Sequence, residues 1–65
     1  MAPTMRDLAK ACERETAMRR RVYPRWVADR RMNPVTADKE IALMEAAAAH
    51  FRALADAEEA KWRLL

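Results

Sequence analysis

Residues 37–65 read ADKEIALMEAAAAHFRALADAEEAKWRLL, and this stretch decides the fold. Counting alternately four and three residues from Ala37 gives a hydrophobic residue at almost every step, which predicts a long helix with one face packed on another helix. Only Glu58 interrupts the repeat. We expect it to be an exposed residue near the helix end, the alternative being a buried polar group that sets the register of a dimer. The repeat comprises Ala37, Ile41, Met44, Ala48, Phe51, Ala55, Glu58, Trp62 and Leu65.

The start of this helix is marked by Asn33 and Pro34. Asparagine is a favoured N-cap, and proline is favoured at the first helical position because its fixed φ suits the helix. We therefore predict a turn at about 32–34 and a second arm over about 34–64. At 1.5 Å per residue such an arm spans roughly 45 Å, close to the length of the chain segment before the turn. Two arms of matched length predict an antiparallel helical hairpin.

The first arm is expected over about residues 4–31. Thr4 is a suitable N-cap, and Asp7 three residues later replaces the glutamate of a capping box. The apolar pattern continues past Pro24, where proline removes a backbone donor and clashes with the preceding turn, so the arm is either kinked there or broken into two helices near residues 21–23. The expected stripe comprises Met5, Leu8, Cys12, Arg19, Val22 and Trp26, flanked by Ala9, Thr16, Tyr23 and Val27.

Length and composition predict one all-α domain over residues 1–65 that needs a partner. A chain of 65 residues with one cysteine buries little apolar surface and forms no internal disulfide. Leu43, Ala47 and Leu54 also widen the apolar face of the second arm beyond what one neighbouring helix covers. We therefore predict a homodimer that forms a four-helix bundle, the alternative being a marginal monomer whose alanines only raise helix propensity. The candidate core and dimer residues are Leu8, Val22, Ile41, Met44, Ala48, Phe51, Ala55 and Trp62.

Charge is divided unevenly between the arms. Residues 1–33 carry nine basic and four acidic groups, a net charge of +5, whereas residues 34–65 carry a net charge of −2. Arginines gather near the turn with two aromatic residues between them, which predicts a docking surface for an acidic protein or a phosphate backbone. The alternative is a solvated helix face whose arginines pair with Glu40 and Glu45 across the hairpin. The candidate partner-binding residues are Arg19, Arg20, Arg21, Tyr23, Arg25, Trp26, Arg30 and Arg31.

The sequence predicts neither catalysis nor a metal or other cofactor. His50 has no cysteine or second histidine nearby to share a metal ion, and Cys12 suits a small core position. No signal peptide or membrane-spanning segment is expected, and the single cysteine favours a cytoplasmic location. Trp62 either packs near the start of the first arm or remains an exposed anchor for a partner.

Three short stretches of the chain carry a resemblance to known proteins. Residues 21–28 read RVYPRWVA, residues 31–33 read RMN and residues 37–46 read ADKEIALMEA. The region from residue 19 to about 52 resembles a segment of small phage and prophage proteins, above all in VYPR followed by DKEIA. Such relatives carry a glycine before the Arg-Met pair, where this chain has Arg30. A non-glycine residue tolerates a left-handed helix C-cap less well, so this departure bears on the geometry of the turn.

The chain also resembles the phage-encoded anti-activators of quorum sensing, which are short helical proteins that dimerise and bind host proteins to disable them. This resemblance implies a non-enzymatic phage accessory protein that binds and inhibits a host protein through a dimeric helical surface. The alternative is a small basic protein that binds nucleic acid. A steep fall of affinity with salt would favour the second function, because it accompanies the neutralisation of phosphates.

Overall fold

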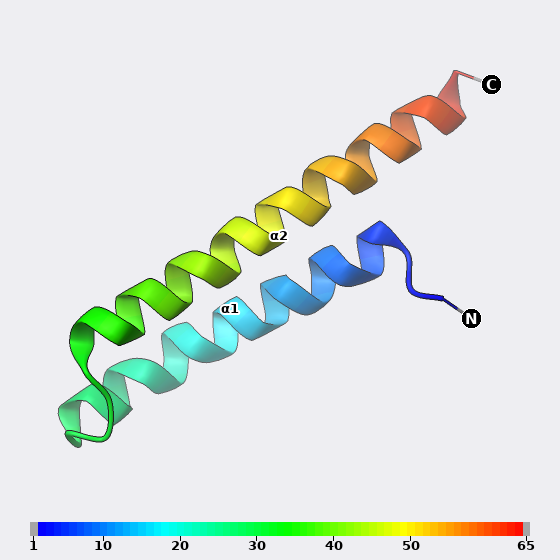
Figure 1. Cartoon of the computed structure of the whole chain (residues 1–65). Coiled ribbons are helices and arrows are strands. Elements are labelled where there is room, and N and C mark those ends of the chain that lie inside the picture. The colour runs from blue at the N-terminus through cyan, green and yellow to red at the C-terminus, as the bar shows by residue number, and fades with distance from the viewer. Residues whose placement is uncertain (1, 65) are drawn as a thin grey trace.

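The computed structural model describes residues 2–64 as two antiparallel α-helices joined by a short turn (Figure 1). Helix α1 spans Met5–Ala28 and helix α2 spans Pro34–Arg63. The predicted all-α hairpin is confirmed, and none of the described residues forms a strand. Helix α1 ends at Ala28 rather than near residue 31, so the turn covers residues 29–33 and is longer than predicted.

Both helix starts have the caps expected from the sequence. At α1, the Thr4 hydroxyl accepts a hydrogen bond from the Asp7 amide, and the Asp7 carboxylate accepts one from the Thr4 amide. The hydrogen bonds from Thr4, together with the nearby charges of Lys10 and Arg14, lower the pKa of Asp7. At α2, the side-chain oxygen of Asn33 accepts a hydrogen bond from the amide of Val35 at 2.8 Å. These local bonds fix where each helix begins.

The end of α1 is closed by a Schellman motif. The Arg30 amide donates to the carbonyl of Val27 at 3.0 Å, and the Arg31 amide donates to the carbonyl of Trp26 at 2.8 Å. This pattern requires a left-handed residue just after the C-cap, and Arg30 occupies that position with φ of 59°. Arginine therefore takes a conformation that glycine adopts at lower cost.

Pro24 lies inside α1 and does not divide it. The alternative of two separate helices near residues 21–23 is therefore wrong. Proline donates no hydrogen bond to the carbonyl of Arg20, but the next residue towards the N-terminus, Tyr23, is buried against α2. This packing keeps the last turn of α1 helical despite the missing bond.

Small side chains and one tyrosine form the contact between the two helices. In α1, Ala9, Thr16 and Tyr23 are buried at intervals of seven residues, the spacing of a helix seam. The buried Thr16 hydroxyl donates to the carbonyl of Cys12 at 2.8 Å, so its polar group has a partner. The centre of the α1 stripe therefore differs from the prediction, because the residues expected at its flank are the buried ones.

The buried residues of α2 are Ala37, Ala48 and Ala55, which belong to the repeat expected from the sequence. Three larger members of that repeat are only half-buried, because a single neighbouring helix covers just the middle of the stripe. Trp62, a candidate core or dimer residue whose alternative was an exposed anchor, is 73% exposed in the hairpin. Glu58 is exposed, in agreement with its expected place near the helix end. The half-buried candidate core residues are Leu8, Val22, Ile41, Met44 and Phe51.

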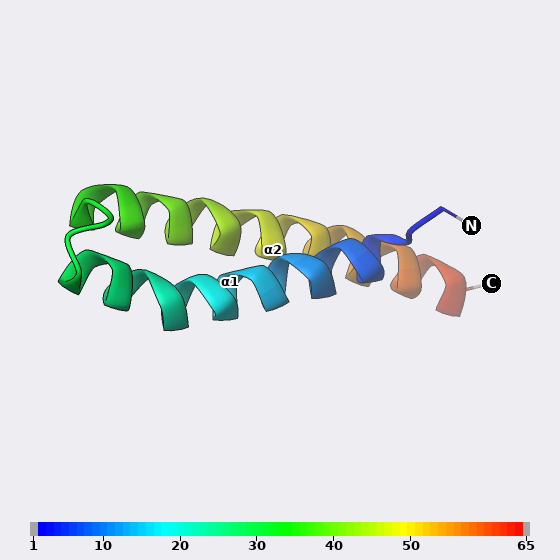
Figure 2. The same cartoon turned by 90° about the horizontal axis from the view of Figure 1, so that it is seen from below.

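The hairpin is long and thin, and the second view shows a single layer of two helices (Figure 2). Its extents are 53 × 22 × 15 Å, and its radius of gyration is 15.3 Å. A compact chain of this length has a radius of gyration of about 11 Å. Helix α2 extends past the start of α1, so its last turns have no helical neighbour (Figure 1). The fold thus leaves much of both helices open to contact.

Candidate interaction surfaces

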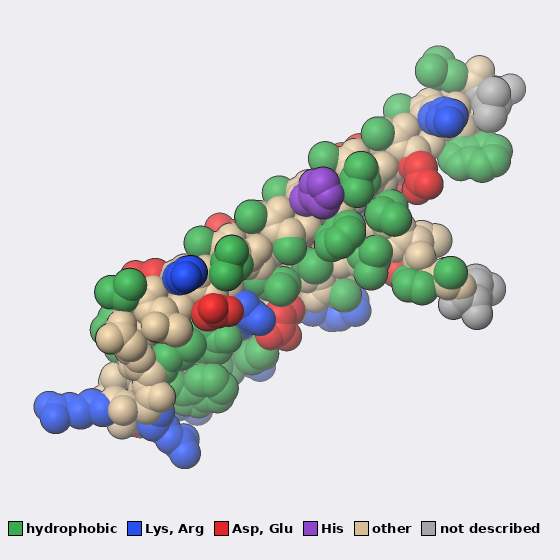
Figure 3. Space-filling view, viewed as in Figure 1, with side chains coloured by type: hydrophobic (Ala, Val, Ile, Leu, Met, Phe, Trp, Pro, Cys, Tyr) green, Lys and Arg blue, Asp and Glu red, His purple; other side chains and the backbone are tan. Residues whose placement is uncertain are grey.

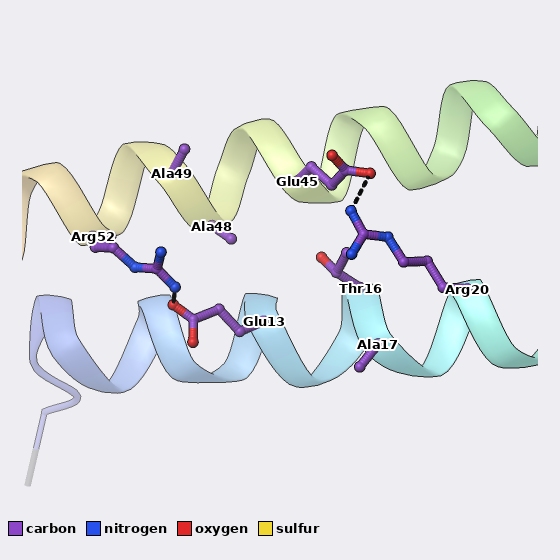
Figure 4. Close-up of a pocket in the computed structure, with 8 residues that line it drawn as sticks. All are labelled: Glu13, Thr16, Ala17, Arg20, Glu45, Ala48, Ala49 and Arg52. Atoms are coloured by element: carbon purple, nitrogen blue, oxygen red, sulfur yellow. Dashed lines mark hydrogen bonds and ion pairs between the residues drawn. The ribbon is translucent and has the colours of Figure 1, made fainter.

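Interhelical ion pairs occupy one side of the hairpin, which we call the ion-pair face. Arg20 pairs with Glu45 at 2.7 Å, and Arg52 pairs with Glu13 (Figure 4). These four side chains surround an open cleft of about 300 Å³ whose floor includes Ala48. All four are substantially exposed, so each pair contributes only about 0–1 kcal/mol to stability.

The same face continues towards the chain termini. Arg6 of α1 pairs with Asp56 at 2.7 Å and with Glu59 at 3.0 Å. The hydrogen bond that Arg6 donates to Asp56, and to a smaller extent the one to Glu59, raises the pKa of Arg6. Acidic groups of α2 are thus engaged by the basic groups of α1 that face them, as the opposite net charges of the two arms imply.

The opposite side of the hairpin is the apolar face. At 100° per residue, Leu8, Val22 and Trp26 lie on the edge of α1 away from the ion-pair face. Leu43, Phe51 and Leu54 lie on the matching edge of α2. Hydrophobic side chains follow both helices in the space-filling view, with a small group of charges between them (Figure 3). Three of these large hydrophobic residues are exposed: Trp26 to 38%, Leu54 to 42% and Leu43 to 54%.

An arginine with two carboxylates occupies the middle of the apolar face. Arg19 donates to Glu15 at 3.0 Å and to the backbone carbonyl of Glu40 at 2.8 Å, and its guanidinium lies 3.6 Å from the Glu40 carboxylate. Its side chain is only 17% exposed and lies over the Tyr23 ring at 5.9 Å. The Glu15 hydrogen bond raises the pKa of Arg19, so this group remains a cation. Arg19 therefore joins the helices and is not a free basic group.

The third surface lies on the side of α1 that points away from α2. Lys10, Arg14, Arg21 and Arg25 share one arc of about 60° there and span about 22 Å along the helix axis. All four are exposed, and none makes an ion pair within residues 2–64. Arg30 and Arg31 follow in the turn, where basic side chains project from the end of the molecule (Figure 3). We call these six residues the basic stripe.

The structure does not gather the sequence-predicted partner residues into one surface. Arg19 and Trp26 lie on the apolar face, Arg20 lies on the ion-pair face, and Tyr23 is buried in the seam. Tyr23 stacks on Trp26 with ring centroids 5.5 Å apart, which holds the indole beside the seam. Only four of the predicted basic residues belong to the basic stripe, namely Arg21, Arg25, Arg30 and Arg31.

Sequence reasoning missed Lys10 and Arg14 as members of this surface. The sequence spacing identifies them, because the basic residues 10, 14, 21 and 25 recur at helical intervals and so lie on one side of α1. Arginines adjacent in sequence do not share one side of a helix, and Arg19 and Arg20 point towards α2 instead.

The groups considered for chemistry are separate from one another. Cys12 is a half-buried free thiol, and exposed His50 stands edge-on to the ring of Phe51 at 5.6 Å. Within residues 2–64, no three side chains of the metal-binding types come together at one place. Across the same residues, neither helix combines the length and the apolar character that crossing a bilayer requires. No protein-family model, curated protein or solved structure matches this chain.

Proposed function

We propose that this chain is a non-enzymatic phage or prophage accessory protein that binds and inhibits a host protein in the host cytoplasm. It acts as a homodimer in which two hairpins pack through their apolar faces as a four-helix bundle. The observation that carries the proposal is the apolar face itself. It runs along both helices and has no covering element within the described chain.

The composition of the seam supports dimerisation. The buried hydrophobic residues among residues 2–64 are four alanines and one tyrosine, so the hairpin alone buries little large apolar surface. Its larger side chains lie beside the seam, where a second hairpin can cover them. Such an arrangement also removes water from Arg19 and its partners Glu15 and Glu40. A buried polar group with its hydrogen bonds satisfied favours one register of the bundle over others.

The overhanging end of α2 supports a separate contact with a host protein. Trp62 is 73% exposed and belongs to the last turn of α2, the helix end that extends past the start of α1 (Figure 1). Tryptophan is enriched among the residues that dominate binding energy, since one side chain brings a large rigid apolar area and a hydrogen-bond donor. We assign Trp62 as the anchor for the host partner.

A capture experiment with matched variants tests this function. The tagged chain, Trp62→Ala and Val35→Ala are each incubated with lysate of a bacterial host, and bound proteins are identified by mass spectrometry. Val35 is a suitable control because it is 76% exposed but lies at the opposite end of α2. We expect one host protein to be retained by the wild type and Val35→Ala and lost from Trp62→Ala. Equal retention by both variants would remove the assignment of Trp62.

A further inference from the structure

The fold divides the basic residues of α1 into two groups. Arg6, Arg19 and Arg20 face α2 and are held by its carboxylates or by Glu15. The basic stripe faces away, and within residues 2–64 no carboxylate pairs with any of its members. Four of the six carboxylates of α2 pair with Arg6, Arg19 or Arg20 across the seam, and the positive charge of the stripe is left for an external anion.

The acidic groups that accompany the stripe do not cancel it. Asp7 lies on the same side of α1, but its carboxylate is engaged with the Thr4 amide in the capping box. The hydrogen bonds from Thr4 lower the pKa of Asp7, and the nearby charges of Lys10 and Arg14 lower it further in smaller part. Asp29 is the C-cap residue at the other end. Four cations of α1 and two of the turn therefore outnumber these two carboxylates.

From these contacts we infer that the basic stripe binds the phosphate backbone of double-stranded nucleic acid without reading its bases. Duplex DNA carries one negative charge per about 1.7 Å of its axis, so a straight row of cations about 22 Å long can meet several phosphates at once. This activity is additional to the proposed binding of a host protein and uses a different side of the molecule.

Two observations favour duplex nucleic acid over other anionic partners. The exposed large hydrophobic residues of the described chain all lie outside the stripe, whereas protein–protein interfaces have an apolar centre. Protein–DNA interfaces are more polar and strongly positive. Single strands are usually held by base stacking on aromatic rings, but Tyr23 is buried and Trp26 lies on the apolar face.

Fluorescence anisotropy with a labelled 20-base-pair DNA duplex of arbitrary sequence tests the inference. The stripe variant is Arg14→Gln, Arg21→Gln and Arg25→Gln combined. The control variant is Lys39→Gln, Lys61→Gln and Arg63→Gln combined, which instead removes three exposed cations from α2 that form no ion pair among residues 2–64. Both variants lower the formal net charge of +3 by the same amount. Circular dichroism establishes that each variant is helical before binding is compared.

We expect the stripe variant to bind at least about tenfold more weakly than the wild type, and the control to remain within about threefold. A plot of log affinity against log salt concentration should have a slope of about −4 to −5 for the wild type. For the stripe variant the magnitude of this slope should be smaller by about 3, because three phosphate contacts are removed. Equal losses in the two variants would show a general charge effect and overturn the proposal. Equal affinity for a polyglutamate peptide or for a single strand of the same length would also overturn it.

Discussion

At the scale of single residues, the neighbours of each arginine decide what it does. Arg19 and Arg20 are adjacent in sequence, yet the first is 17% exposed on the apolar face and the second is 58% exposed on the ion-pair face. Arg21 follows them and points to solvent as part of the basic stripe. Three consecutive identical residues therefore have three environments, because each step around a helix turns the side chain by 100°.

Arg30 leads to a prediction at the same scale. Its φ of 59° is left-handed, and a residue with a Cβ atom is strained there by about 1 kcal/mol relative to glycine. Arg30→Gly should therefore raise the melting temperature, by about 4–8 °C per kcal/mol for a chain of this size. Arg31→Gly is the control, because it removes the same charge from a residue without positive φ. A thermal melt in which the two variants behave alike would show that the left-handed backbone is not strained.

At the scale of helices, α1 combines strong start and stop signals with an internal defect. The capping box and the Schellman motif satisfy backbone groups at its two ends. Pro24, four residues before the end of the helix, has no backbone N–H, so the carbonyl of Arg20 lacks its usual hydrogen-bond donor. The helix tolerates this defect because packing on α2, rather than intrinsic propensity, supplies most helical stability in folded chains.

We predict that Pro24→Ala stabilises the hairpin. Alanine restores the donor to the Arg20 carbonyl and removes the clash of the ring, which together should raise the free energy of unfolding by about 1–3 kcal/mol. Pro34→Ala should be neutral or destabilising, since Pro34 stands at the helix start where its φ is favourable. Urea denaturation followed by circular dichroism distinguishes these outcomes. A loss of stability in Pro24→Ala would mean that the ring makes packing contacts worth more than the lost bond.

At the scale of the whole molecule, shape and seam composition argue for a second copy of the chain. The hairpin is elongated, with a radius of gyration of 15.3 Å. Because alanines make up most of its buried seam, the large apolar side chains lie uncovered along one face. Burial of apolar surface contributes about 25 cal/mol per Å², so covering this face with an identical face supplies stability that the single hairpin lacks. The ion-pair face and the basic stripe remain outside such a bundle.

We predict that multi-angle light scattering at micromolar concentration gives twice the 7.5 kDa chain mass. Leu43→Glu combined with Leu54→Glu should give the monomer mass, because it places two charges on the apolar face. Ala46→Glu combined with Ala53→Glu is the control, since these exposed residues lie on the outer side of α2. A wild-type mass of 7.5 kDa would overturn the dimer while leaving the test of the basic stripe unaffected.

The sequence by itself determined the helices and their starts. Thr4 with Asp7, and Asn33 with Pro34, form caps from residues close together in the chain, so their outcome depends little on the rest of the fold. The 3.5-residue repeat likewise identified the face of α2 that meets α1, as Ala37, Ala48 and Ala55 show. The end of α1 was expected near residue 31 but lies at Ala28, because the left-handed Arg30 ends the helix although arginine is an uncommon residue in that conformation.

Only the tertiary structure decided which basic groups are free and which residues centre the α1 seam. Composition does not distinguish Arg20, which reaches Glu45 across the seam, from Arg21, which pairs with no carboxylate of residues 2–64. Leu8 and Val22 were expected at the centre of α1, yet the small Ala9 and Thr16 are buried instead. The physical reason is that the close approach of the two helices along Ala9 and Thr16 favours small side chains on the contact line, while the large Tyr23 fits only near the turn. That choice depends on both helices together.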